Sequence, residues 1–148
     1  MSSNSNSNLI VACNILNRVQ AMLQGGNRVQ LSNDTLRSIS DYLIKCTKYI
    51  DPTIKEINTQ YIVFTSAAES IHDLLETSGA QMINNDTKEF LVDQLEPTIT
   101  EFRVNVGRYL ADNDFNYSPA MDSVLKGIVD TCLENGYYFG LEVSSYGI

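Results

Sequence analysis

The 148-residue sequence has no tryptophan, a single histidine, three prolines, no long apolar run and no cluster of basic residues. A membrane span needs about 20 consecutive apolar residues, so none is predicted. The formal net charge is -8, and the ten Lys and Arg residues are scattered singly. No basic face therefore exists to displace counterions from phosphates, which argues against unaided binding to nucleic acid or to an anionic membrane.

Cysteine is also scarce. Cys13, Cys46 and Cys132 lie far apart and form no Cys-x-x-Cys pair. Each lies at an apolar helical position, so we interpret all three as buried, reduced thiols in a reducing compartment. The first residues are rich in Ser and Asn and lack the basic segment of a secretory signal. The sequence therefore predicts a cytoplasmic protein.

The single histidine limits the available chemistry. Glu69 and His72 have the Glu-x-x-His spacing of di-iron bundles, but such sites need a second copy of the motif. Residues 112–116 are similar to the start of a calcium-binding loop. Such a loop needs Gly at its sixth position and Glu at its twelfth, where this sequence has Tyr117 and Ser123. We predict no enzymatic activity, no metal and no cofactor. An enzyme or metal protein based on Glu69 and His72 remains the weaker hypothesis.

The clearest pattern present is an apolar stripe between Asp51 and Gly79, spaced alternately three and four residues apart, which predicts one long amphipathic helix. Asp51 is expected to cap its start, Pro52 to occupy the first helical position and Gly79 to end it in the left-handed conformation. The stripe consists of Ile54, Ile57, Tyr61, Phe64, Ala68, Ile71 and Leu75.

The same reasoning predicts further helices on both sides. The pattern predicts helices over residues 8–24, from Asn33 with Ser32 among its caps, from Asp86 with Glu89 in a capping box, and from Ser118 to Gly136. Pro97 is expected to kink or break the fourth helix near Leu95.

Residues 1–7 are expected to be a disordered arm, because they are polar and low in apolar content. Residues 8–148 are expected to form one compact all-α domain of five to six helices, globin-like or a helical bundle. The last twelve residues fit either a short helix or an extended flap. Tyr137, Tyr138 and Phe139 follow a helix stop, and we predict that these aromatic side chains contact a partner.

The run from Leu36 to Leu43, continued through residues 48–51, resembles an early helix of the phycobiliprotein family. Other segments of that family find similar counterparts here in consistent order. Residues 102–112, 122–127 and 130–136 are similar to later segments, and residues 24–32 to an inter-helix loop. The resemblance implies a globin-type fold and a subunit that assembles with other proteins.

One departure bears on function. Phycobiliproteins attach a linear tetrapyrrole through a cysteine in a Cys-x-Arg-Asp-like motif, whereas the corresponding residues 90–96 here contain neither cysteine nor arginine. No pigment-site residue can be carried over, and Asp93 is at most a remaining acidic position. The resemblance therefore implies a pigment-free member that binds a protein partner or associates with itself into an oligomer.

A second resemblance gives the alternative. Residues 102–108 are similar to the Asn-Trp-Gly-Arg signature of the B-cell-lymphoma family of apoptosis regulators, with Val106 in place of Trp. In that family the arginine, here Arg108, pairs with an acidic residue of an amphipathic helix bound in a hydrophobic groove. This resemblance implies a viral-type apoptosis regulator, with Arg108 as a partner-binding residue.

Overall fold

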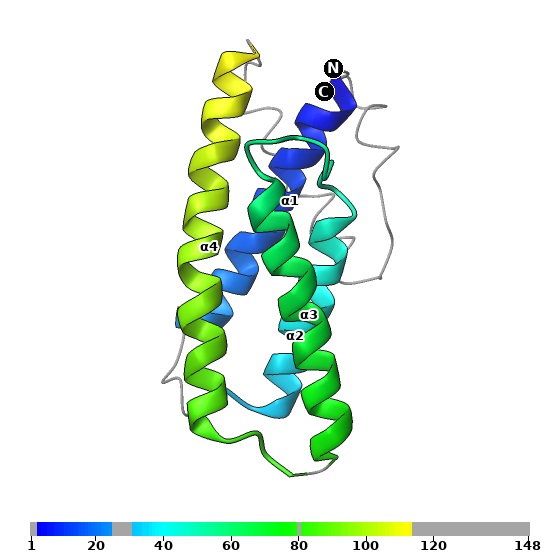
Figure 1. Cartoon of the computed structure of the whole chain (residues 1–148), viewed down its shortest axis with the longest axis vertical. Coiled ribbons are helices and arrows are strands. Elements are labelled where there is room, and N and C mark those ends of the chain that lie inside the picture. The colour runs from blue at the N-terminus through cyan, green and yellow to red at the C-terminus, as the bar shows by residue number, and fades with distance from the viewer. Residues whose placement is uncertain (1–2, 25–30, 80, 114–148) are drawn as a thin grey trace.

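The computed structural model describes residues 3–24, 31–79 and 81–113, and this part of the chain contains four α-helices (Figure 1). They are α1 (Ser3–Gln24), α2 (Asn33–Thr47), α3 (Asn58–Ser78) and α4 (Asn85–Asp112). The predicted all-α class is confirmed for these ranges. The expected fifth helix and the aromatic segment after it lie outside the described residues.

The first helix begins earlier than its sequence suggests. α1 starts at Ser3, whereas the periodic pattern begins at Asn8 and residues 1–7 were expected to form an arm. Serine and asparagine are weak helix formers. Here, however, Asn6 and Ser7 are buried together with Leu9. The helix that is anchored by the buried apolar residues from Leu9 onward thus extends over this segment despite its poor intrinsic propensity.

The start of α3 differs from the prediction. Asp51 does not cap the helix, because its carboxylate accepts hydrogen bonds from the Thr53 backbone N–H at 2.9 Å and from the Thr53 hydroxyl at 2.6 Å. Two successive turns follow, in which the N–H of Ile54 bonds to the carbonyl of Asp51 and the N–H of Ile57 to that of Ile54. The helix proper begins only at Asn58. The apolar stripe is nevertheless buried throughout, apart from a half-buried Tyr61.

The other helix ends follow local capping chemistry. The Ser32 side chain accepts a hydrogen bond from the Thr35 N–H at 3.1 Å, as predicted for the start of α2. At the start of α4 the cap is Asn84, whose Oδ1 accepts from the Thr87 N–H at 2.8 Å, rather than Asp86. Gly79 ends α3 with a positive φ of 60°, although its ψ of -122° lies outside the left-handed helical region.

Pro97 does not divide the fourth helix, which is continuous from Asn85 to Asp112. A proline removes one helical hydrogen bond, but Pro97 is exposed while the opposite face of α4 packs into the core. The buried face includes the six residues in phase in the sequence, Leu91, Leu95, Ile99, Phe102, Val106 and Tyr109. Packing of this face compensates for the lost hydrogen bond.

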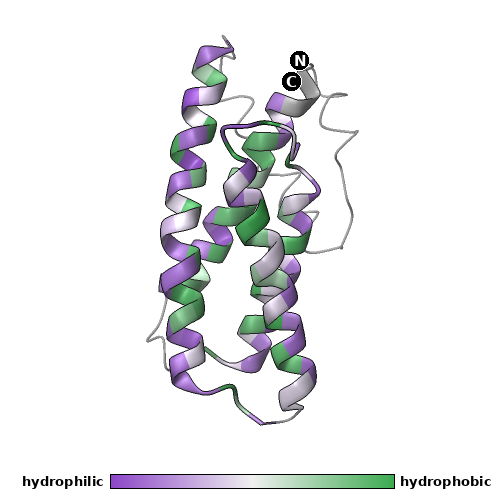
Figure 2. Ribbon diagram, viewed as in Figure 1, coloured by the Kyte–Doolittle hydropathy of each residue, from purple (hydrophilic) through white to green (hydrophobic). Residues whose placement is uncertain are grey.

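The four helices form a bundle in which consecutive helices run in opposite directions (Figure 1). Each helix packs against two neighbours, in the cyclic order α1, α2, α3, α4. Apolar and polar residues alternate around the helices (Figure 2), and the apolar ones supply the buried core. Between α3 and α4, the rings of Phe64 and Phe102 meet edge to face with centroids 5.5 Å apart. In the described part of the chain, no helix is long and apolar enough to cross a bilayer.

Candidate functional site

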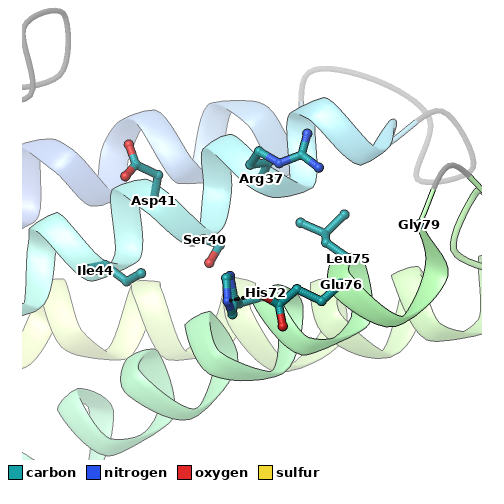
Figure 3. Close-up of a pocket in the computed structure, with 8 residues that line it drawn as sticks. All are labelled: Arg37, Ser40, Asp41, Ile44, His72, Leu75, Glu76 and Gly79. Atoms are coloured by element: carbon teal, nitrogen blue, oxygen red, sulfur yellow. Dashed lines mark ion pairs between the residues drawn. The ribbon is translucent and has the colours of Figure 1, made fainter.

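A groove lies between α2 and α3, with a volume of about 480 Å³. The close-up shows that the side chains lining it come from both helices (Figure 3). We call this feature the α2–α3 groove. Its lining residues are Arg37, Ser40, Asp41 and Ile44 from α2, and His72, Leu75, Glu76 and Gly79 from the second half of α3 and its end.

Small side chains bring the two helices together beneath the groove. The buried Ser40 hydroxyl donates a hydrogen bond to the backbone carbonyl of Ala68 at 3.0 Å. A serine bonded in this way satisfies its own polar group while it links the two helices. Ala67 and Ala68 of α3 are both buried. The base of the groove is therefore a fixed helix–helix contact.

One apolar side chain of the groove is open to solvent. Ile44 is 44% exposed, whereas Leu75 is almost fully buried. Isolated exposed apolar residues are common on protein surfaces. Ile44 differs from such cases in lying at a concave site between two rigid helices. This arrangement is typical of a surface that receives an apolar side chain.

Charged side chains also line the groove, and each has a polar partner within its own helix. Lys45 Nζ lies 2.9 Å from Asp41 Oδ2, and His72 Nε2 lies 3.0 Å from Glu76 Oε1. Arg37 Nη1 lies 3.0 Å from Asp34 Oδ1. Exposed pairs of this kind contribute little to stability. The charges of Arg37 and Asp41 are therefore balanced locally by Asp34 and Lys45.

The exposed face of α3 is acidic beside the groove. Glu69, Asp73 and Glu76 are exposed and lie four and three residues apart, so they share one helix face. The helix contains no Lys or Arg along its whole length, and its last turn has no basic residue. His72 is the one side chain of α3 that can become cationic. The last turn of α3 thus supplies no positive charge of its own to the negative end of the helix dipole.

The residues that the sequence singled out for partner binding are not part of this groove. Arg108 is exposed near the end of α4, which does not line the groove. Its neighbour Asn105 donates hydrogen bonds to the carbonyl of Glu56 at 3.1 Å and to Gln60 Oε1 at 3.4 Å. Tyr137, Tyr138 and Phe139 lie outside the described residues.

Asn105 and Val106 have structural roles in this bundle. The two hydrogen bonds of Asn105 connect α4 to the α2–α3 connection and to the first turn of α3. Val106 is buried in the core. Two of the four residues in the Asn-Val-Gly-Arg segment thus hold helices together, and Arg108 remains exposed at the surface.

Glu69 and His72 also differ in their surroundings from the ligands of a metal site. Both are exposed, and the imidazole contacts Glu76 one turn further on. Within residues 3–24, 31–79 and 81–113, no three His, Cys, Asp or Glu side chains converge closely enough to hold a metal ion.

The two cysteines in the described ranges are unreactive in character. Cys46 is fully buried, and its Sγ donates to the carbonyl of Ala12 at 3.7 Å. Burial raises the pKa of Cys13 from 9.0 to about 12, with a small opposing effect of Arg103. Burial is the main cause that raises the pKa of Cys46 well above its ordinary value, and the neighbouring Cys13 raises it further. Because the thiolate is the nucleophilic form, both groups are poor nucleophiles at neutral pH.

Sequence reasoning missed the α2–α3 groove, because the groove depends on which helix packs beside α2. The acidic face of α3 was predictable from the spacing of Glu69, Asp73 and Glu76 in a segment without Lys or Arg.

No protein-family model matches this chain, and neither a curated protein nor a solved structure matches it.

Proposed function

We propose that this chain is a non-catalytic, all-helical subunit that acts in the cytoplasm by binding protein, either a partner or another copy of itself. The observation that supports it is the α2–α3 groove, in which the exposed Ile44 offers an apolar contact and Asp41, His72 and Glu76 offer polar ones. A protein interface usually combines apolar contacts with polar and charged ones.

The phycobiliprotein-like interpretation belongs to the same proposal. A globin-type subunit without its pigment would retain helix-to-helix contacts as its main activity. Residues 90–96, where that family carries its attachment cysteine, have neither cysteine nor arginine. Leu91, Val92 and Leu95 of this segment are buried in the bundle core. The test is mixing the protein with a bilin, since a covalent, red-shifted adduct would contradict the pigment-free interpretation.

The alternative function, binding an amphipathic death-motif helix in the manner of the B-cell-lymphoma family, depends on Arg108. The exposure of this side chain on α4 is compatible with pairing to an acidic partner residue. Titration with death-motif peptides tests it, because binding should weaken in Arg108→Ala if the arginine pairs with the peptide. A peptide that does not bind, together with unaltered properties of Arg108→Ala, would rule this alternative out.

The protein-binding proposal is tested with a photo-crosslinking amino acid at position 44. Position 62 provides the control, because Ile62 is an exposed isoleucine of α3, 54% exposed, that does not line the groove. We expect position 44 to cross-link to one protein or to a second copy of the chain, and position 62 not to do so. A protein identified by this cross-link is then purified, and it should form the same complex with the purified chain.

Two further measurements complete the test. Ile44→Asp should abolish the purified complex, whereas Ile62→Asp should leave it intact. Light scattering during size-exclusion chromatography, at several concentrations, separates self-association from binding of a different protein. A chain that stays monomeric and forms no Ile44-dependent complex would refute the proposed function.

A further inference from the structure

We propose that the α2–α3 groove receives a basic, amphipathic helix of a protein partner. This inference rests on the proposed function and adds the chemistry and secondary structure of the bound segment. An apolar side chain of that helix would lie against Ile44, and its Lys and Arg side chains would face Glu69, Asp73 and Glu76. Ile44 and Glu76 line the groove, and Glu69 and Asp73 lie on α3 beside it.

The first reason is charge complementarity. Arg37 and Asp41 have ion-pair partners within α2, at 3.0 Å and 2.9 Å. On α3 the Glu76 carboxylate contacts the imidazole of His72, and the helix contains no Lys or Arg to pair with the carboxylates of Glu69 and Asp73. The Lys- and Arg-free α3 therefore contributes negative charge beside the groove. A positively charged partner is attracted to it, whereas an acidic one is repelled.

The second reason is the position of Glu76 in the last turn of α3. The carboxyl end of a helix carries a partial negative charge, so a basic side chain there is favourable and an acidic one is unfavourable. The last turn of α3 contains Glu76 and no basic residue, and the groove extends to Gly79 at the end of the helix. Cationic side chains from a partner would supply the positive charge that the last turn of α3 lacks.

The third reason concerns the spacing of the acidic residues. Glu69, Asp73 and Glu76 stand at positions i, i+4 and i+7 of α3, which covers about two helical turns or roughly 10 Å. Basic residues at the same spacing on a partner helix lie along one face and match this length. The apolar residues of an amphipathic helix occupy the adjacent face. A helix lying along the groove thus presents both kinds of contact at once.

The binding test uses a synthetic amphipathic peptide of roughly 20 residues, with a leucine face and a Lys/Arg face. Fluorescence anisotropy measures its Kd for the full chain at low and high salt. Two control peptides are compared, one with every Lys and Arg replaced by Glu and one of unchanged composition with the amphipathic order removed. We expect binding of the basic amphipathic peptide only, weakening as salt rises.

The acidic residues are then tested against a matched set. The variant Glu69→Gln/Asp73→Asn/Glu76→Gln should weaken binding about tenfold at low salt. The control Glu89→Gln/Glu101→Gln/Asp112→Asn removes the same charge from exposed positions of α4 and should change the Kd less than about twofold. Equal losses in both variants would mean non-specific attraction to an acidic protein and would overturn the inference.

A further variant separates loss of binding from loss of folding. Glu76→Lys places a basic residue in the last turn of α3, where it suits the helix dipole, so the variant should unfold at no lower a denaturant concentration than the natural chain. It should nevertheless lose peptide affinity. Unchanged peptide affinity in a folded Glu76→Lys protein would contradict the proposed charge contact.

The failure of this inference can be told apart from failure of the proposed function. A protein cross-linked at position 44 whose contact segment is acidic, neutral or extended would refute the basic-helix inference and leave the groove as a binding site. Absence of any Ile44-dependent complex, with the peptide or with a protein, would refute both.

Discussion

Gly107 and Gly79 are expected to respond in opposite directions to the same substitution. Gly107 lies inside α4, five residues before its end at Asp112, and it is exposed. Among the described residues, no atom lies within 4 Å of a Cβ built at this position. Alanine there reduces the backbone entropy lost on folding and meets no obstacle, so Gly107→Ala should stabilise the protein by about 0.8 kcal/mol.

Gly79 also has open space around an added Cβ within the described part of the chain, yet its backbone conformation changes the outcome. Its φ of 60° and ψ of -122° lie in a region that residues with a Cβ rarely adopt. Gly79→Ala must therefore strain this conformation or rearrange the end of α3. We expect a destabilisation of about 1–3 kcal/mol.

The two variants should thus differ by roughly 2–4 kcal/mol in their free energies of unfolding. Urea denaturation followed by circular dichroism measures this difference, and an unchanged m-value would show that the compared states are the same. Because the sites are independent, the double variant should equal the sum of the two effects. A destabilising Gly107→Ala would refute the reasoning, since it would mean that another group packs against this position.

Three other predictions concern the core, a helix cap and the buried thiols. A double-mutant cycle with Phe64→Leu and Phe102→Leu should give a coupling energy of about 1 kcal/mol in urea denaturation, because their rings meet edge to face, and additive effects would contradict that contact. Asn84→Ala should cost about 1 kcal/mol and Asn84→Asp much less, since the side chain caps α4; equal costs would show that the side-chain oxygen is not the stabilising group. Cys13 and Cys46 have raised pKa values when folded, so their stabilising effect is complete below the unfolded value of 9.0 and is lost as pH rises towards about 12. Urea denaturation between about pH 8 and 11 should show this decline, with a shallower slope in Cys13→Ala or Cys46→Ala, and an unchanged slope would contradict the burial of the thiols.

The helical stripes were predictable because they depend on residue periodicity alone. The residues in phase on α4 are all buried, and the stripe of α3 is buried with one half-buried exception, Tyr61. Amphipathic spacing of this kind persists in any bundle that covers the apolar face. The all-α class therefore followed from the sequence, whereas the cyclic order of the helices and their alternating direction required coordinates.

The helix ends were less predictable because several polar residues compete for each cap. Asp51 has the right chemistry for a cap, but its carboxylate bonds to Thr53 in a local turn, and α3 begins at Asn58. At α4, both Asn84 and Asp86 suit the cap, and the structure uses Asn84. Side chains of this type bond to nearby backbone in helical and non-helical forms alike, and tertiary packing decides between them.

α3 has one face that is stabilised by apolar packing and another whose acidic residues do not favour the helix. Its apolar face packs against α2 and α4, and Phe64 meets Phe102 at the second of these contacts. Its exposed face carries three carboxylates without a Lys or Arg, one of them at the end of the helix where a negative charge is unfavourable. Departures from local consistency in natural proteins concentrate at functional sites. This departure lies beside a groove with an exposed isoleucine, and the binding of a cationic partner that we propose would account for both features.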